Sequence, residues 1–250
     1  MNMEYHRFYS HCLGKDMEFK SYGSHGKPVV VFPSSGGRFY EYEDFQMVDA
    51  CLPFLEQGLI RLYTVDSIDH ESWLNHNASP MEIGKRHNEY DAYVIQELVP
   101  FVRRHTDYSG KLMTTGCSMG GFHSANFFFR HPDVFDTVVA LSGLYDIRFF
   151  LGDALNEYDI YINSPIDYLS NLNDPWYLEQ YRQSNIIICT GLGAWEEDAI
   201  RDTRHLEWVL TEKQVPAWID YWGETVNHDW AWWRIQMPYF LDQLRLQKRL

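Results

Sequence analysis

The sequence predicts an α/β protein built on a mostly parallel, doubly wound β-sheet. Short apolar runs rich in β-branched residues, such as residues 29–32 (VVVF) and 185–190 (NIIICT), are typical of strands that are buried on both faces. Segments with helical periodicity separate these runs, and the connections are short. Such alternation produces a parallel sheet with helices on both faces. Because ligands bind these sheets at the carboxyl ends of the strands, the polar loops at those ends are the candidate functional segments.

The elements follow one another in a regular order. Residues 4–11 and 16–22 predict an antiparallel hairpin with its turn near Gly14-Lys15, and residues 29–32 predict a central strand. Further strands are expected at 59–65, 111–115, 137–143, 185–190 and 217–222, and helices at 41–57, 88–105, 123–130, 201–213 and 232–247. Residues 144–184 lack a clean period and are rich in Tyr, Asn, Asp and Pro, so we expect a small cap of short helices and loops there.

Length and composition limit the possible functions. The 250 residues suit one domain over 1–250, with 144–184 as the inserted cap. A net charge of −14 argues against nucleic acids and anionic membrane surfaces as partners, and no run approaches the roughly 20 apolar residues of a membrane span. Four scattered cysteines and an N-terminus without an apolar run predict free thiols in a cytoplasmic protein. The surplus of aromatic residues is consistent with a homo-oligomer.

Residues 116–120 (GCSMG) match the pattern G-x-S-x-G. This pattern is typical of a sharp strand-to-helix turn that exposes a serine hydroxyl at the end of a sheet. The flanking residues agree, because an apolar strand is predicted before Ser118 and a buried helix after it. The pentapeptide alone also occurs by chance, so the assignment depends on partners elsewhere in the chain.

His228 is the strongest candidate among the eleven histidines for a base that would activate Ser118. It lies in a loop after the last predicted strand, whereas His123 and His205 lie on predicted helices where a structural role is favoured. A carboxylate would fix the tautomer of this histidine and stabilise its protonated form. Glu196, Glu197 and Asp198 all follow the strand at 185–190; a tight Gly-x-Gly turn favours Glu196, and Asp202 would require a longer loop.

Residues 33–40 (PSSGGRFY) form a small, glycine-rich loop directly after the central strand. Backbone N–H groups in such a loop can bind an oxyanion, although a plain turn or a phosphate loop are alternatives; the phosphate loop lacks its G-K-[ST] ending. The Asp/His/Glu residues at 66–71 suggest a metal site only weakly, because no second ligand cluster accompanies them. Trp73 and Arg38 are expected to line a substrate pocket.

These residues together resemble the esterase family of α/β-hydrolases that includes esterase D (S-formylglutathione hydrolase), feruloyl esterases and mycolyltransferases. The resemblance covers nearly the whole chain and rests on VVVFPSSGG, ELVPFV, TGCSMGG, ALSG and NHDW, with nucleophile, acid and histidine in the order of the α/β-hydrolase fold. It implies that Ser118 is the nucleophile, His228 the base and Glu196 the acid. The amides of Met119 and of Ser35, or alternatively Gly36, would form the oxyanion hole. Pro33-Ser34 replaces the usual His-Gly or Asp-Gly, which leaves that last choice open.

The resulting expectation is a serine carboxylesterase that acts on short-chain esters through an acyl-enzyme, without cofactor or metal. An acyltransferase and a thioesterase on the same scaffold are the alternatives, followed by a non-catalytic binding module.

Overall fold

The computed structural model describes residues 2–152 and 154–250. Its described part contains one eight-stranded sheet with the strand order β1-β2-β4-β3-β5-β6-β7-β8. The strands are β1 Met3–Ser10, β2 Lys15–Tyr22, β3 Lys27–Phe32, β4 Ile60–Val65, β5 Leu112–Cys117, β6 Phe135–Leu141, β7 Asn185–Thr190 and β8 Trp218–Tyr221. β1 and β2 pair as an antiparallel hairpin and β2 joins β4 antiparallel, whereas all pairs from β4 to β8 are parallel. The predicted doubly wound sheet with its N-terminal hairpin is confirmed.

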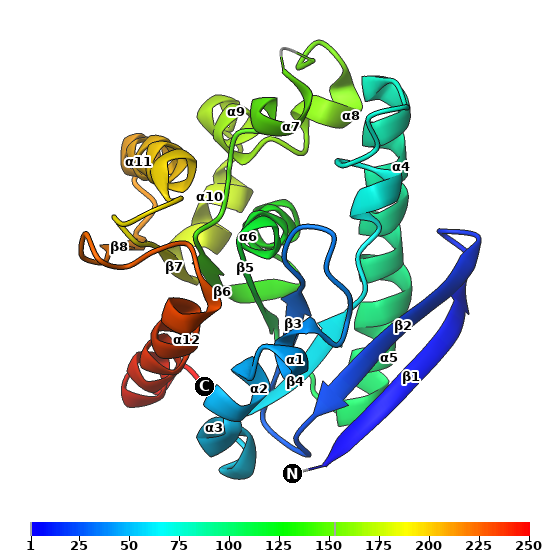
Figure 1. Cartoon of the computed structure of the whole chain (residues 1–250), viewed down its shortest axis with the longest axis vertical. Helices are drawn as coiled ribbons and strands as arrows, with labels where there is room; N and C mark the ends of the chain where they lie inside the picture. The colour runs from blue at the N-terminus through cyan, green and yellow to red at the C-terminus, as the bar shows by residue number, and fades with distance from the viewer. Residues whose placement is uncertain (1, 153) are drawn as a thin grey trace.

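Helices cover both faces of the sheet (Figure 1). They are α1 Glu41–Asp44, α2 Met47–Ala50, α3 Leu52–Glu56, α4 Pro80–Tyr93, α5 Val99–Thr106, α6 Met119–Arg130, α7 Arg148–Leu151, α8 Tyr158–Tyr161, α9 Pro165–Asn171, α10 Pro175–Arg182, α11 Glu197–Glu212 and α12 Trp230–Leu246. A 3₁₀ turn spans Asp69–Glu71, and a π-helical segment, Val94–Leu98, joins α4 to α5.

The alternation of side chains along the central strands divides the core into two layers. On β3, Val30 and Phe32 face the layer packed by α4, α5, α6 and α11, while Val29 and Val31 face the layer packed by α2, α3 and α12. All six residues of β3 are buried, as are all six of β5. Burial on both faces explains why these strands are continuous apolar runs without polar alternation.

Two helix predictions need correction. The helix expected at 41–57 is three short helices, because Gln46 adopts a left-handed conformation (φ 60°) and Pro53 restarts the chain in α3. The helix expected from residue 88 begins at Pro80, where Ser79 and Glu82 form a reciprocal capping box. Pro100 lies in the first turn of α5, directly after the π-helical segment, so the chain continues through the proline as a helix.

The described residues of the segment 144–184 form four short helices, α7 to α10, between β6 and β7. Figure 1 places α7, α8 and α9 together at the top of the molecule, beside the N-terminal end of α4. No described helix is long and apolar enough to cross a membrane.

His87 is a buried histidine in the core between α4 and α6. Its side chain is fully buried on α4, stacks on His123 (ring centroids 5.5 Å apart) and packs at a tilt against Trp73 (4.6 Å). Neither nitrogen has a hydrogen-bond partner among the described residues. Burial, with smaller contributions from His123 and Arg130, lowers the pKa of His87 well below its ordinary value of 6.5. The unfolded chain therefore binds a proton below about pH 6.5 that the folded chain does not.

We expect the free energy of unfolding to fall as the pH drops below about 6.5, by about 1.4 kcal/mol per pH unit for this one proton. His87→Phe keeps the ring and removes the titration, so its unfolding free energy should depend less steeply on pH between 6.5 and 5. Urea unfolding at several pH values measures the two slopes, with the exposed His25→Gln as control. Equal slopes in wild type and His87→Phe would contradict this account.

Candidate active site

Ser118 stands at the apex of the turn between β5 and α6. Its backbone has φ 57° and ψ −122°, a conformation that non-glycine residues rarely adopt. The turn brings α6 close to the neighbouring strand: a Cβ on Gly120 would lie 2.3 Å from the carbonyl oxygen of Phe32, and one on Gly116 would lie 2.4 Å from the carbonyl carbon of Gly120. The glycines of the G-x-S-x-G pattern are therefore required by close backbone contact.

His228 reaches Ser118 from the loop between β8 and α12. Its Nε2 lies 2.9 Å from the Ser118 Oγ, and its Nδ1 lies 3.1 Å from the Oε2 of Glu196. The His228 backbone N–H donates to the carbonyl of Ala194 at 3.0 Å, which ties the histidine loop to the loop that carries Glu196. The imidazole edge packs against the Trp233 ring at 4.9 Å. The ring is thus held between a hydroxyl and a carboxylate.

The Glu196 side chain is fully buried, and several groups bind its carboxylate. The Ser142 hydroxyl donates to Oε1 at 2.7 Å, the Thr190 hydroxyl to Oε2 at 3.1 Å and the Gly191 amide to Oε1 at 3.3 Å. The indole of Trp233 donates to the Ser142 hydroxyl at 3.0 Å. These bonds compensate for the loss of water around a buried charge.

Ser142, Thr190 and Trp233 were not identified as site residues from the sequence. The first two are polar residues at the carboxyl ends of β6 and β7, and that position is the signal that could have found them. Trp233 is one of several tryptophans on α12, and only the fold distinguishes it from the others.

The other acids considered from the sequence lie away from His228. Glu197 is an exposed residue at the start of α11, and Asp198 pairs with Arg201. Asp202 accepts the amides of Tyr145 and Asp146 at 2.9 and 3.0 Å, and burial raises its pKa. Of the four acids, Glu196 alone is hydrogen-bonded to His228.

The loop after β3 runs beside the Ser118 turn, because Phe32 and Gly116 are partners in the parallel pairing of β3 and β5. Glu41 holds the start of this loop: its carboxylate accepts the Ser34 amide at 2.7 Å and the Ser34 hydroxyl at 2.5 Å. Burial raises the pKa of Glu41, although these bonds oppose the rise. The amide of Gly36 faces the Asp69 carboxylate at 3.4 Å. No described residue accepts the amides of Ser35 and Met119, so these two N–H groups are available to a ligand.

Of the two residues expected to line a substrate pocket, Trp73 is buried, which corrects that prediction, and Arg38 is held in ion pairs. Trp73 is 1% exposed and packs against His87 and Phe122, so it supports the core beneath the site and offers no free surface. Arg38 donates to Asp66 at 2.6 Å and to Glu18 at 2.7 Å, which anchors the end of its loop to β2 and β4. The acids at 66–71 do not meet at one point, because Asp69 binds His123 and Glu71 pairs with Arg86.

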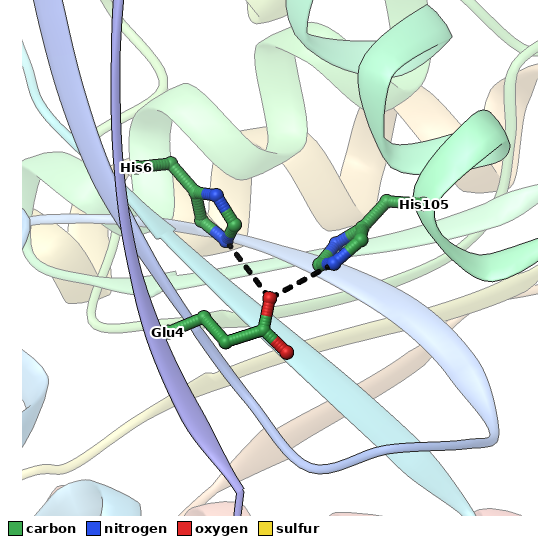
Figure 2. A group of neighbouring side chains, drawn as sticks. All are labelled: Glu4, His6 and His105. Atoms are coloured by element: carbon green, nitrogen blue, oxygen red, sulfur yellow. Dashed lines mark hydrogen bonds and ion pairs between the residues drawn. The ribbon is translucent and has the colours of Figure 1, made fainter.

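Among the described residues, one group has the spacing of metal ligands: Glu4 and His6 of β1 with His105 of α5. Figure 2 shows both imidazoles directed at the Glu4 carboxylate. However, the guanidinium of the buried Arg61 lies 3.1 Å from the Nε2 of His105 and 3.5 Å from the Oε1 of Glu4. This guanidinium already supplies positive charge to the cluster and would repel a metal ion. We interpret the group as a charge network that joins the hairpin to α5.

A mostly parallel sheet with a G-x-S-x-G turn after β5 and a histidine after the last strand is typical of the α/β-hydrolase fold. The family model described as "Putative esterase" matches residues 10–244, and the chain belongs to this family. It is a serine ester hydrolase, as the sequence predicted. No curated protein matches the sequence.

Solved structures with the same fold are distant in sequence. A ferulic acid esterase superposes with a TM-score of 0.75 at 15% identity over 96% of each chain. An S-formylglutathione hydrolase from Agrobacterium tumefaciens gives 0.74 at 13% identity, over 96% of this chain and 93% of the other. MPT51 of Mycobacterium tuberculosis gives 0.70 at 13% identity over 98% of each chain. At these identities the similarity establishes the fold alone.

Gly120→Ala tests the close contact at the turn. The new methyl would collide with the Phe32 and Pro33 carbonyls (2.3 and 2.7 Å), so α6 must move away from β3. We expect a loss of about 1–3 kcal/mol in the free energy of unfolding, measured by urea denaturation. Gly223→Ala is the matched control, since a Cβ there has nothing within 4 Å. A Gly120→Ala protein as stable as wild type would exclude the collision.

Glu196→Gln tests the acid. A neutral amide cannot stabilise a protonated His228, so kcat for an ester should fall by about 10²–10⁴-fold with little change in KM. Glu197→Gln should remain within twofold of wild type, because that side chain is exposed. Full activity in Glu196→Gln, with loss in Glu197→Gln, would transfer the role to Glu197.

Proposed function

We propose that the protein is a serine carboxylesterase that hydrolyses short-chain esters through an acyl-enzyme on Ser118. The observation that carries this proposal is the continuous arrangement of Ser118 Oγ, His228 Nε2 and Nδ1, and the Glu196 carboxylate, with bonds of 2.9 and 3.1 Å. A serine hydroxyl becomes an effective nucleophile when a base takes its proton during attack. A neutral imidazole can accept that proton and return it to the leaving group.

In the first half-reaction the Ser118 oxygen attacks the ester carbonyl carbon while its proton moves to the His228 Nε2. The carbonyl π electrons move to oxygen, which becomes the oxyanion of a tetrahedral intermediate. When this intermediate collapses, the bond to the alcohol oxygen breaks and His228 gives that oxygen the proton. The alcohol leaves, and the acyl group remains on Ser118. Glu196 accepts the Nδ1–H throughout, which keeps the Nε2 lone pair directed at the serine.

In the second half-reaction a water molecule takes the place of the alcohol. His228 accepts one of its protons while the water oxygen attacks the acyl carbon. Collapse of the second intermediate breaks the acyl–Ser118 bond, and His228 returns the proton to the serine oxygen. The acid product and the starting enzyme result.

We assign the stabilisation of both oxyanions to the amides of Ser35 and Met119. Their availability supports this assignment, because the neighbouring amides of Ser34 and Gly36 face the carboxylates of Glu41 and Asp69. The Met119 amide is at the first residue of α6, where the helix dipole also favours negative charge. One such donor contributes about 10²–10³-fold to the rate.

The short-chain preference rests on the cap formed by residues 144–184, whose helices have four to eight residues. A short cap rich in aromatic side chains favours a small acyl pocket. Thioester hydrolysis uses the same steps with a thiolate as leaving group, and acyl transfer uses an alcohol in place of water. Comparing oxygen esters with thioesters, and adding an alcohol acceptor, would distinguish these reactions.

The first test is hydrolysis of p-nitrophenyl acetate, butyrate and octanoate by wild type and Ser118→Ala. We expect faster turnover of acetate and butyrate than of octanoate, and a loss on the order of 10³-fold or more in the variant, because the attacking oxygen is absent. A fluorophosphonate should add once to wild type, at Ser118 by peptide mapping, and not to Ser118→Ala.

The exposed Ser24→Ala is the matched control and should retain both activity and labelling. If wild type neither hydrolyses the three esters nor reacts with the fluorophosphonate, the catalytic proposal fails and a non-catalytic binding module becomes the favoured interpretation.

A further inference from the structure

Asp69 lies between the loop after β3 and the helix that follows Ser118. It begins the 3₁₀ turn after β4 and is 2% exposed. One carboxylate oxygen, Oδ1, is 2.9 Å from the Nε2 of His123 on α6, and the other, Oδ2, is 3.4 Å from the amide of Gly36. Asp69 therefore joins two segments on which a Ser118 mechanism depends.

The contact between Gly36 and this turn is close. Gly36 has φ 65°, and a Cβ there would lie 2.8 Å from the Nε2 of His70. The loop is thus pressed against the turn that begins at Asp69, and the Gly36 amide is directed into the protein. This direction matters for the preceding amide, that of Ser35, because each peptide unit is planar and the amides on both sides of it, those of Ser34 and Gly36, are held by carboxylates.

His123 fixes the carboxylate from the other side. Its ring is 1% exposed and lies among Phe32, His87 and Phe122, at centroid distances of 5.9, 5.5 and 5.2 Å. Because the ring is enclosed, the Nε2–H can donate only where it points, which is at Asp69. A buried carboxylate with two fixed donors has a defined orientation.

We propose that Asp69, oriented by His123, is a positioning residue for the oxyanion hole. It binds the Gly36 amide and so leaves the Ser35 amide directed at the reacting carbonyl oxygen. The inference rests on the proposed esterase function and also selects Ser35 over Gly36 as the donor. Glu41 does the same for the Ser34 amide, so the two carboxylates fix the loop on both sides of Ser35.

Asp69→Asn is the decisive variant. An asparagine removes the negative charge that binds both donors and replaces one acceptor oxygen with an NH2 group, so the Gly36 amide and the His123 Nε2–H can no longer both bind a carboxylate oxygen. A misplaced donor of this kind should lower kcat for p-nitrophenyl acetate on the order of 10- to 100-fold. KM should change less than about threefold, because the ground-state ester makes little use of the oxyanion donors. The rate is expressed per active site titrated with fluorophosphonate, so that unfolded protein does not count.

A second readout separates positioning from a general structural role. Trifluoroacetophenone adds to a serine hydroxyl and forms a tetrahedral oxyanion, so its inhibition constant reports on the oxyanion hole. We expect Asp69→Asn to weaken this inhibition by the same factor as it lowers kcat/KM. Glu71→Gln, on the same 3₁₀ turn but paired with Lys15 and Arg86, is the matched control and should leave both quantities unchanged.

His123→Phe tests the chain of contacts. This variant should lower kcat by part of the factor seen in Asp69→Asn. In the double variant, kcat should fall by less than the product of the two single factors, because both substitutions act through one carboxylate.

An Asp69→Asn enzyme with wild-type kcat and inhibition would overturn the proposal. So would a fall in kcat with unchanged trifluoroacetophenone binding, since the defect would then lie outside the oxyanion hole. Failure of the proposed function is distinguishable from both, because wild type itself would then be inactive and unlabelled, and this inference would fall with it.

Discussion

The close approach of α6 to β3 is the constraint on which the rest of the site depends. Gly120 sits against the carbonyl of Phe32 at a distance that no side chain permits. Because of this contact, the serine at the end of β5 and the loop at the end of β3 share one small region, with Phe32 and Gly116 in register. The strained backbone of Ser118 is tolerated because buried strands and a buried helix hold both of its ends.

Three carboxylates are buried among the candidate-site loops. Glu196, Asp69 and Glu41 are each at least nine-tenths buried, at 0%, 2% and 9% exposure, which would be costly without hydrogen bonds. Each is bound by groups from other elements: Glu196 by Ser142 and Thr190, Asp69 by His123, and Glu41 by Ser34. These hydrogen bonds offset the cost of burial and hold each carboxylate in one orientation. Glu196 then fixes the His228 ring, and Glu41 and Asp69 fix amides of the loop after β3.

Local patterns predicted the parts of the site that depend on local geometry. The glycines around Ser118 and the loop position of His228 marked both residues as candidates, and the structure places the Ser118 Oγ 2.9 Å from the His228 Nε2. The choice of Glu196 over Glu197 was favoured by a Gly-x-Gly turn, but the loop path that brings Glu196 to His228 also depends on the hydrogen bond between His228 and Ala194.

Asp69 and His123 could not be paired from the sequence, because they lie 54 positions apart and meet only through the strand order. The same limit explains Trp73, whose burial depends on α4 and α6, and the helix at 41–57, which was broken by a left-handed Gln46 that no pattern marks.

The groups that would carry the chemistry come from the ends of strands or the loops beside them, and none comes from residues 144–184. A site of this kind can keep its geometry when the inserted segment changes. The contacts that position its side chains come from the strands and their loops, and not from the helices of residues 144–184. This separation is consistent with structures at 13–15% identity superposing over 93% or more of both chains. If residues 144–184 form the cap of the proposed function, we expect substrate preference to depend on them. Changes in the cap should alter which acyl group is accepted with little effect on kcat for a small ester, whereas changes at Glu41, Asp69 or Glu196 should lower the rate for every ester.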